Sequence, residues 1–134
     1  MTLLLDTHTI LWMTEQVTKL GRVARRSCDD ALAARELAIP VIAFYEAGRL
    51  LKRGRVEGPP TVREWRQRLL SFGVKEVAMS SEVAVLASEL DDLHGDPIDR
   101  VIVATAIVEG AVLLTADRPI LDWPGSMRRQ DARR

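Results

Sequence analysis

The chain has 134 residues, of which 47% are hydrophobic and 4% aromatic, and its acidic and basic side chains balance to a net charge of zero. We expect one domain, 1–134, and the aliphatic-rich composition favours an α/β or all-α protein over a β-sandwich. The single cysteine excludes an intramolecular disulfide and a thiolate metal cluster, and the neutral balance gives no indication of nucleic-acid binding by bulk charge.

The N-terminus carries no charged, cleavable leader and no stretch is long enough to span a membrane, so we expect a cytoplasmic protein. The charges are segregated along the chain. Basic side chains gather over 49–68 and again over 128–134, whereas 82–99 contains acids and no Lys or Arg. Solvated helix faces account for such blocks as readily as binding surfaces do.

Short apolar runs alternate with helical patterns in the N-terminal half. Leu3-Leu4-Leu5 predicts a buried strand that stops at Asp6, which can also cap the next helix. The remaining elements are predicted at 7–13 (helix), 20–34 (amphipathic helix), 37–39 (strand, ended by Pro40) and 41–53 (helix). Glu46 is unusual because it lies on an apolar stripe of the last helix. An ion pair with Arg49 or Arg53 is the alternative to a functional role for it.

The C-terminal half continues the alternation. After a loop over 54–60, Thr61 and Glu64 match a capping box. The predicted elements are a helix through 70, a strand over 74–79, a helix capped by Ser80 or Ser81, a helix over 97–109, a strand over 111–114, a short turn or helical piece over 119–123, and an edge strand in the tail.

The segment 94–118 is the most informative one. Asp96 suits a helix cap, Pro97 the first helical position, and Asp99 then falls in the first turn of a helix that is apolar nearly all round. The apolar strand that follows ends at Thr115, and Asp117 stands just past it. A buried helix therefore begins with a carboxylate and a buried strand ends with one. Asp96 itself fits a structural cap better than a ligand.

Strands that alternate with helices predict a parallel sheet with helices on both faces, and ligands bind such sheets outside the carboxyl ends of the strands. If the first and fourth strands are neighbours, Asp6 and Asp117 are adjacent there, and Asp99 and Glu46 can join them. Clustered carboxylates need a counter-charge, and Mg²⁺ or Mn²⁺ suits oxygen ligands. Such an ion activates water for phosphodiester hydrolysis, and Thr7 or Thr115 can orient that water.

The segments LLLDTHTILW, AFYEAGRLLKRGRV and HGDPIDRVIVATAIVEGAVLLTADRPIL resemble the three acidic blocks of the PIN-domain family, most closely the VapC-type toxins of toxin–antitoxin pairs. The resemblance implies a three-layer α/β/α sandwich with a central parallel sheet of about five strands. It also implies Mg²⁺- or Mn²⁺-dependent endoribonuclease activity, a homodimer and a small cognate antitoxin. The family's metal-binding acids match Asp6, Glu46, Asp99 and Asp117.

An acidic site needs basic side chains to attract an RNA backbone. Arg49, Lys52, Arg53 and Arg55 follow Glu46 and are our candidates, whereas Arg100 can instead hold carboxylates in place. His8 and His94 flank matched acids, but we keep them outside the predicted site. We expect Trp12, Trp65 and Trp123 to be core or interface anchors, since no aromatic–basic pattern in the sequence indicates base stacking.

Two other functions fit the pattern less well. An aspartate-based phosphotransfer or phosphatase domain accounts for Asp6 at a strand end. The haloacid type, however, requires an acid where this chain has His8. A receiver domain requires paired acids near its first strand and a lysine after its last strand. A non-catalytic RNA- or protein-binding module is the second alternative, against which the four intact acids argue.

Overall fold

A computed structural model describes all residues, 1–134. The strands are β1 (Leu3–Leu5), β2 (Leu37–Pro40), β3 (Lys75–Val77), β4 (Val112–Thr115) and β5 (Arg128–Asp131). The helices are α1 (Thr7–Thr14), α2 (Arg22–Ala33), α3 (Ile42–Lys52), α4 (Val62–Phe72), α5 (Ser81–Glu89), α6 (Pro97–Glu109) and α7 (Arg118–Leu121). None of the helices combines the length and the apolar character needed to cross a lipid bilayer.

The five strands form one parallel sheet in the order β3-β2-β1-β4-β5. From β1 the chain moves outward to β2 and β3 and then returns to place β4 on the other side of β1. This return makes the β1–β4 border the point at which the strand order reverses, where ligands bind in open α/β sheets. Leu5 pairs with Leu114 across that border. The two strands are neighbours, which is the adjacency that the predicted acid cluster required.

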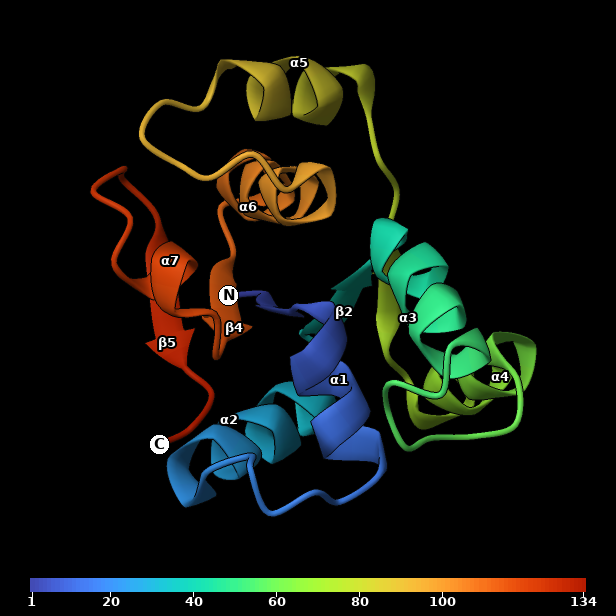
Figure 1. Ribbon diagram of the computed structural model, residues 1–134. Coiled ribbons are helices and arrows are strands. Elements are labelled where there is room, and N and C mark those ends of the chain that lie inside the picture. Colours follow the sequence, from blue (N-terminus) through green and yellow to red (C-terminus); the bar gives the residue numbers. More distant parts are fainter.

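Helices cover both faces of the sheet (Figure 1). Alternate strand residues point to opposite faces, so Leu3 and Leu5 join the core formed with α1 and α2, while Leu4 joins the core formed with α6. In the first of these cores Trp65 brings in α4 and is fully buried. Helix α5 packs outside α6 as a further layer. The predicted three-layer α/β/α sandwich is confirmed.

Local sequence signals explain most of the boundaries. Thr61 and Ser80 cap α4 and α5, and Gly73 and Gly110 end α4 and α6 with positive φ angles of 97° and 61°. The predicted strand over 74–79 was too long, since β3 holds only three residues. It pairs on one side only, and its Lys75 and Glu76 are exposed. The short piece over 119–123 is helical, as α7, and the tail adds the edge strand β5.

Candidate metal centre

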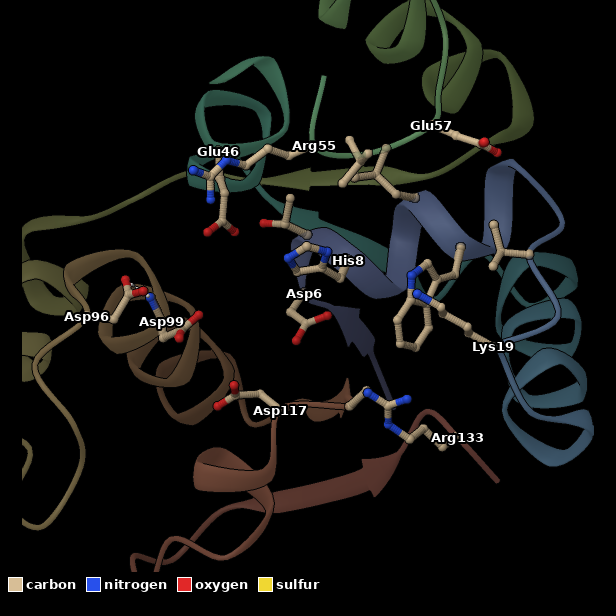
Figure 2. Close-up of a pocket in the computed structure, with 16 residues that line it drawn as sticks. Asp6, His8, Lys19, Glu46, Arg55, Glu57, Asp96, Asp99, Asp117 and Arg133 are labelled. Carbon is tan, nitrogen blue, oxygen red and sulfur yellow. Dashed lines mark hydrogen bonds between the residues drawn. The ribbon is translucent and has the colours of Figure 1, made fainter. Parts of the chain in front are cut away.

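Four acids reach one pocket from four different elements. Asp6 follows β1, Asp117 follows β4, Asp99 lies in the first turn of α6, and Glu46 comes from α3. All four line a pocket of about 770 Å³ at the carboxyl end of the sheet, together with Asp96 (Figure 2). Glu46 forms no ion pair with Arg49 or Arg53, and its carboxylate points into the pocket. The structure thus brings together every acid that the sequence placed in the site.

Asp6 is held from both sides. It is 7% exposed, and one of its carboxylate oxygens accepts a hydrogen bond from the backbone N–H of Thr9, 3.1 Å away, which makes it the N-cap of α1. The other oxygen accepts the hydroxyl hydrogen of Thr115. Burial raises the pKa of Asp6 above its ordinary value, and these hydrogen bonds only partly oppose that effect.

Thr115 joins the two strand-end acids. Its hydroxyl donates to Asp6 and accepts from the backbone N–H of Asp117 at 3.0 Å. Asp117 in turn caps α7 by accepting from the backbone N–H of Ile120 at 3.2 Å. The predicted supporting hydroxyl of Thr115 is therefore occupied in orienting carboxylates. The other predicted hydroxyl, Thr7 Oγ1, is buried in the same pocket and has no hydrogen-bond partner in the protein.

Asp99 has the most strongly perturbed carboxyl group of the cluster. Burial, followed by the negative charges of Asp96, Asp117, Glu46 and Asp6, raises the pKa of Asp99 to about 8. No Lys or Arg side chain forms an ion pair with any of these five acids. The protein itself therefore does not neutralise the cluster, and a bound cation would remove the repulsion that raises this pKa.

His94, which we had kept outside the predicted site, lies beside two of its acids. Its Nε2 lies 3.4 Å from Asp99 Oδ2 and 3.6 Å from Asp117 Oδ2. That nitrogen is buried and makes no hydrogen bond. One donor atom from each of His94, Asp99 and Asp117 falls within 4.8 Å of the others, a spacing that suits a shared metal ion. Its position two residues before the Asp96 cap was the only sequence signal. His8 lines the same pocket without an acid partner.

Two neighbours of Asp99 have structural roles. Asp96 caps α6 by accepting from the backbone N–H groups of Ile98 and Asp99 at 2.9 and 3.3 Å, as the sequence indicated. Arg100 was suggested as a holder of carboxylates, and that suggestion is wrong. Its guanidinium donates to the backbone carbonyl of Ala87 in α5 and to those of Leu90, Leu93 and His94 in the segment between α5 and α6.

Only one of the four predicted RNA-binding cations lines the pocket. Arg55 does so, and its guanidinium lies beside Glu46 (Figure 2). Arg49 instead packs over the ring of Tyr45, with 5.7 Å from its Cζ to the ring centroid. Lys52 and Arg53 do not line the pocket either. The other cations of the pocket are Lys19 and Arg133, which were not among the predicted RNA-binding residues.

The donor set fits a hard divalent cation. Carboxylate oxygens are the ligands that Mg²⁺ and Mn²⁺ prefer, an imidazole nitrogen is compatible with Mn²⁺, and no thiolate is present to favour a softer metal. The orphaned Thr7 hydroxyl and His94 nitrogen are buried polar groups that lack protein partners, and a hydrated ion would supply partners. The residues present thus suit metal-assisted hydrolysis of a phosphate ester.

Comparisons with known proteins agree with this picture. Residues 3–122 match the PIN domain family. Ribonuclease VapC22 of Mycobacterium tuberculosis is 35% identical over 118 residues, which span 87% of this chain and 88% of that protein.

Solved structures share the fold. VapBC2 from Rickettsia felis, bound to a DNA fragment from its promoter, superimposes with a TM-score of 0.71 at 14% identity, over 97% of this chain and 98% of that one. DNA-bound VapBC from Salmonella typhimurium gives 0.70 at 17% identity, over 98% of each chain.

Proposed function

This chain belongs to the PIN domain family, and on that premise we propose that it is a divalent-metal-dependent endoribonuclease, the toxin of a toxin–antitoxin pair. The convergence of Asp6, Glu46, Asp99 and Asp117 on one pocket, with no cation of the protein paired to them, is the observation that carries the proposal. Identity to a ribonuclease over most of both chains supports the same activity. We propose an RNA phosphodiester as the substrate bond and the cytoplasm as the place of action.

The acids would hold one or two ions of Mg²⁺ or Mn²⁺. Asp6, Asp99 and Asp117 lie on the strand-end side of the pocket, Glu46 enters from α3, and His94 is our addition to the ligand set. When bound, the metal supplies a water-derived nucleophile at neutral pH and stabilises negative charge on the scissile phosphate. Every other contribution comes from the chain's own groups.

Side chains of the protein orient the carboxylates and the attacking water and offset the charge of the phosphate. Thr115 fixes the rotamers of Asp6 and the backbone of Asp117, so the two carboxylates are preorganised before substrate arrives. The free hydroxyl of Thr7 can accept or donate one hydrogen bond to the attacking water or to a phosphate oxygen. Arg55 can donate to a phosphate oxygen from the Glu46 side of the pocket.

Cleavage of single-stranded RNA by the purified chain tests the proposal. We expect cleavage with Mn²⁺ or Mg²⁺ and none with chelator. Asp99→Asn should lose at least about 100-fold in cleavage activity, because a direct metal ligand should matter at least as much as the groups that hydrogen-bond to metal ligands. Asp30→Asn, an exposed acid on α2, is the matched control and should retain activity. Full activity in Asp99→Asn would refute the site, and chelator-resistant activity would refute metal dependence.

The remaining alternatives make different predictions. Phosphoprotein formed with acetyl phosphate on Asp6 would favour the phosphotransfer domain. Failure to bind Mn²⁺ at millimolar concentration in calorimetry, together with no cleavage of any RNA, would favour the non-catalytic module. Asp6 already uses both carboxylate oxygens in hydrogen bonds, which suits a fixed ligand better than a free nucleophile.

The proposal includes two protein partners. Likeness of fold to chains in VapBC complexes supports a small antitoxin that covers the acidic pocket. We also propose a homodimer, for which light scattering after size-exclusion chromatography should give twice the 15.0 kDa of one chain. A mass of one chain at micromolar concentration would contradict the dimer.

A further inference from the structure

The metal pocket continues beyond the acids into a small aromatic and basic cluster formed by Trp12, Lys19 and Arg133. All three residues line the same pocket as Asp6 and Asp99. Figure 2 shows Lys19 and Arg133 on one side of the pocket and Asp96 and Asp99 on the other, with Asp6 between them. The pocket therefore has an acidic part suited to a metal and a basic part suited to a phosphate.

Both cations of the cluster lie against the ring of Trp12. Lys19 Nζ is 5.9 Å and Arg133 Cζ 5.4 Å from the centroid of its six- and five-membered ring system, within the range of cation–π attraction. Neither side chain has a carboxylate partner, whereas Arg66 and Arg68 are paired with Glu76 and Glu15. Exposed cations without acidic partners in a concave pocket attract anionic ligands.

Trp12 differs from the other two tryptophans. Trp65 donates its indole N–H to Thr14 Oγ1 and Trp123 donates to the carbonyl of Asp91, and both rings are buried. Trp12 is only half-buried, and its indole N–H donates to no protein group. The expectation that the tryptophans are core or interface anchors holds for Trp65 and Trp123 and only in part for Trp12. One part of it packs against the core, and another part faces the pocket.

The backbone holds the cluster in place. The segment that carries Lys19 is tied to the segment that carries Arg133 by hydrogen bonds from Gly21 N–H to the Ala132 carbonyl, at 2.9 Å, and from Val23 N–H to the Arg134 carbonyl, at 2.8 Å. Any side chain at Gly21 would overlap the backbone of Arg133 and Arg134. Arg25 further fixes the loop by donating to the Val17 carbonyl at 3.2 Å. The two cations are thus preorganised around the ring.

The helix relates the cluster to the metal site. Asp6 caps α1 and Trp12 lies in its second turn, so the two residues are about 9 Å apart along the helix axis. Side chains on a helix lean toward its N-terminus, which directs the Trp12 ring toward the acid end. If one phosphate of an RNA strand is bound at the metal, the neighbouring nucleotide can reach Trp12 over this distance.

We propose that Trp12, Lys19 and Arg133 form a nucleotide subsite for single-stranded RNA, in which an unpaired base stacks on Trp12 and the adjoining phosphates contact Lys19 and Arg133. The inference rests on the proposed function, since it names how that substrate is held. Single strands are the class that fits, because bases in a duplex do not offer a free face for stacking.

RNA binding by full-length variants tests the subsite. We would measure fluorescence anisotropy of a labelled single-stranded oligoribonucleotide with Mg²⁺ in an Asp99→Asn background, which prevents cutting during the titration. Trp12→Leu should bind about tenfold more weakly, as loss of one stacked base predicts. Trp12→Phe keeps an aromatic face and should stay within about threefold of the background protein. Circular dichroism would verify that both variants fold.

The salt dependence gives a second readout that does not disturb packing, since Lys19 and Arg133 are exposed. Loss of two phosphate contacts in Lys19→Gln/Arg133→Gln should lower the slope of log affinity against log salt by about 1.4. Arg26→Gln/Lys75→Gln removes the same charge from α2 and β3, away from the pocket, and should change the slope far less.

Outcomes for the subsite and for the proposed function separate cleanly. The subsite would be overturned if Trp12→Leu and Lys19→Gln/Arg133→Gln bound RNA as tightly as the Arg26→Gln/Lys75→Gln control does. Their slopes of log affinity against log salt would also have to match that of the control. The absence of any RNA binding in the Asp99→Asn background would likewise overturn the subsite. Weakened binding in these variants, without metal-dependent cleavage by the unaltered chain, would support the subsite and refute the nuclease.

Discussion

Asp99 lies in surroundings that disfavour its ionised form. Burial and four neighbouring carboxylates raise its pKa from an ordinary 3.8 to about 8. Its N–H also donates to the Asp96 cap, so the backbone of α6 fixes its position whatever its charge. The same environment that makes Asp99 costly to ionise makes it a strong ligand once a cation is present.

The raised pKa predicts how stability depends on pH. Between about pH 4 and pH 8 the folded, metal-free chain keeps a proton on Asp99 that the unfolded chain has released, so the free energy of unfolding falls as the pH rises. Urea unfolding in chelator should show this fall, by up to about 1.4 kcal/mol per pH unit, and Asp99→Asn should show less of it. Parallel pH profiles of the two proteins would contradict the assignment.

His94 makes a separate prediction at the level of one residue. If its Nε2 is a metal ligand, His94→Gln should weaken Mn²⁺ binding in calorimetry by about tenfold, comparable to the loss of other groups that support metal sites. His8→Gln is the matched control, because His8 lines the pocket but forms no ion pair and is not one of the grouped ligand atoms of His94, Asp99 and Asp117. It should stay within about twofold. Equal affinities in both variants would remove His94 from the ligand set.

Helix starts are the elements that build the site. Asp6, Asp96 and Asp117 cap α1, α6 and α7, so three helices begin at the pocket and direct backbone N–H groups towards it. The positive end of each helix dipole favours nearby negative charge and lowers the cost of assembling carboxylates. Capping and ligand roles are therefore compatible within one side chain, since each carboxylate oxygen has two lone pairs.

Arg100 ties α6 to the segment that carries His94. Its donations to four carbonyls at 2.7 to 3.4 Å, one in α5 and three in this segment, replace the regular structure that the segment lacks. Arg100→Ala should lower the free energy of unfolding in urea by about 3 kcal/mol, because buried carbonyls lose charged donors. Arg66→Ala removes an exposed ion pair with Glu76 and should cost less than about 1 kcal/mol. Similar losses of unfolding free energy in the two variants would show that the segment does not depend on Arg100.

At the scale of the whole molecule, the order of strands positions the acids. The return of the chain from β3 to β4 places the ends of β1 and β4 side by side, and α3 and α6 enter the same edge from opposite faces. Charges that cancel in the total are separated in space, with acids at one part of the pocket and Lys19 and Arg133 at another.

Metal binding should stabilise the entire fold, because the ligands come from elements on both sides of the sheet. Mn²⁺ at about 100 times its Kd would add about 2.7 kcal/mol, which raises Tm by roughly 10 °C for a chain of this size. The shift should be larger at pH 8 than at pH 6, since protons compete for Asp99 at the lower pH. The measurement is thermal denaturation with and without Mn²⁺. If Mn²⁺ raised the Tm of Asp99→Asn as much as that of the unaltered chain, the ion would bind elsewhere.

Local sequence patterns were sufficient to predict the alternation of strands and helices, the caps, and the acids at the ends of β1 and β4. These features depend on short-range preferences: apolar periodicity, the geometry of a capped first turn, and the burial of short apolar runs. The same local patterns identified Asp99 and Glu46 as unusual carboxylates on apolar helices.

Which residues meet across elements could be read only from the folded chain. Strand pairing brought Thr115 to Asp6, the α5–α6 segment brought His94 to Asp99 and Asp117, and the tie between Gly21 and Ala132 brought Arg133 to Trp12. Most of these contacts join residues far apart in the chain, and the His94 contacts also depend on how the irregular α5–α6 segment folds back. Their formation depends on sheet order and helix packing, which local periodicity does not encode.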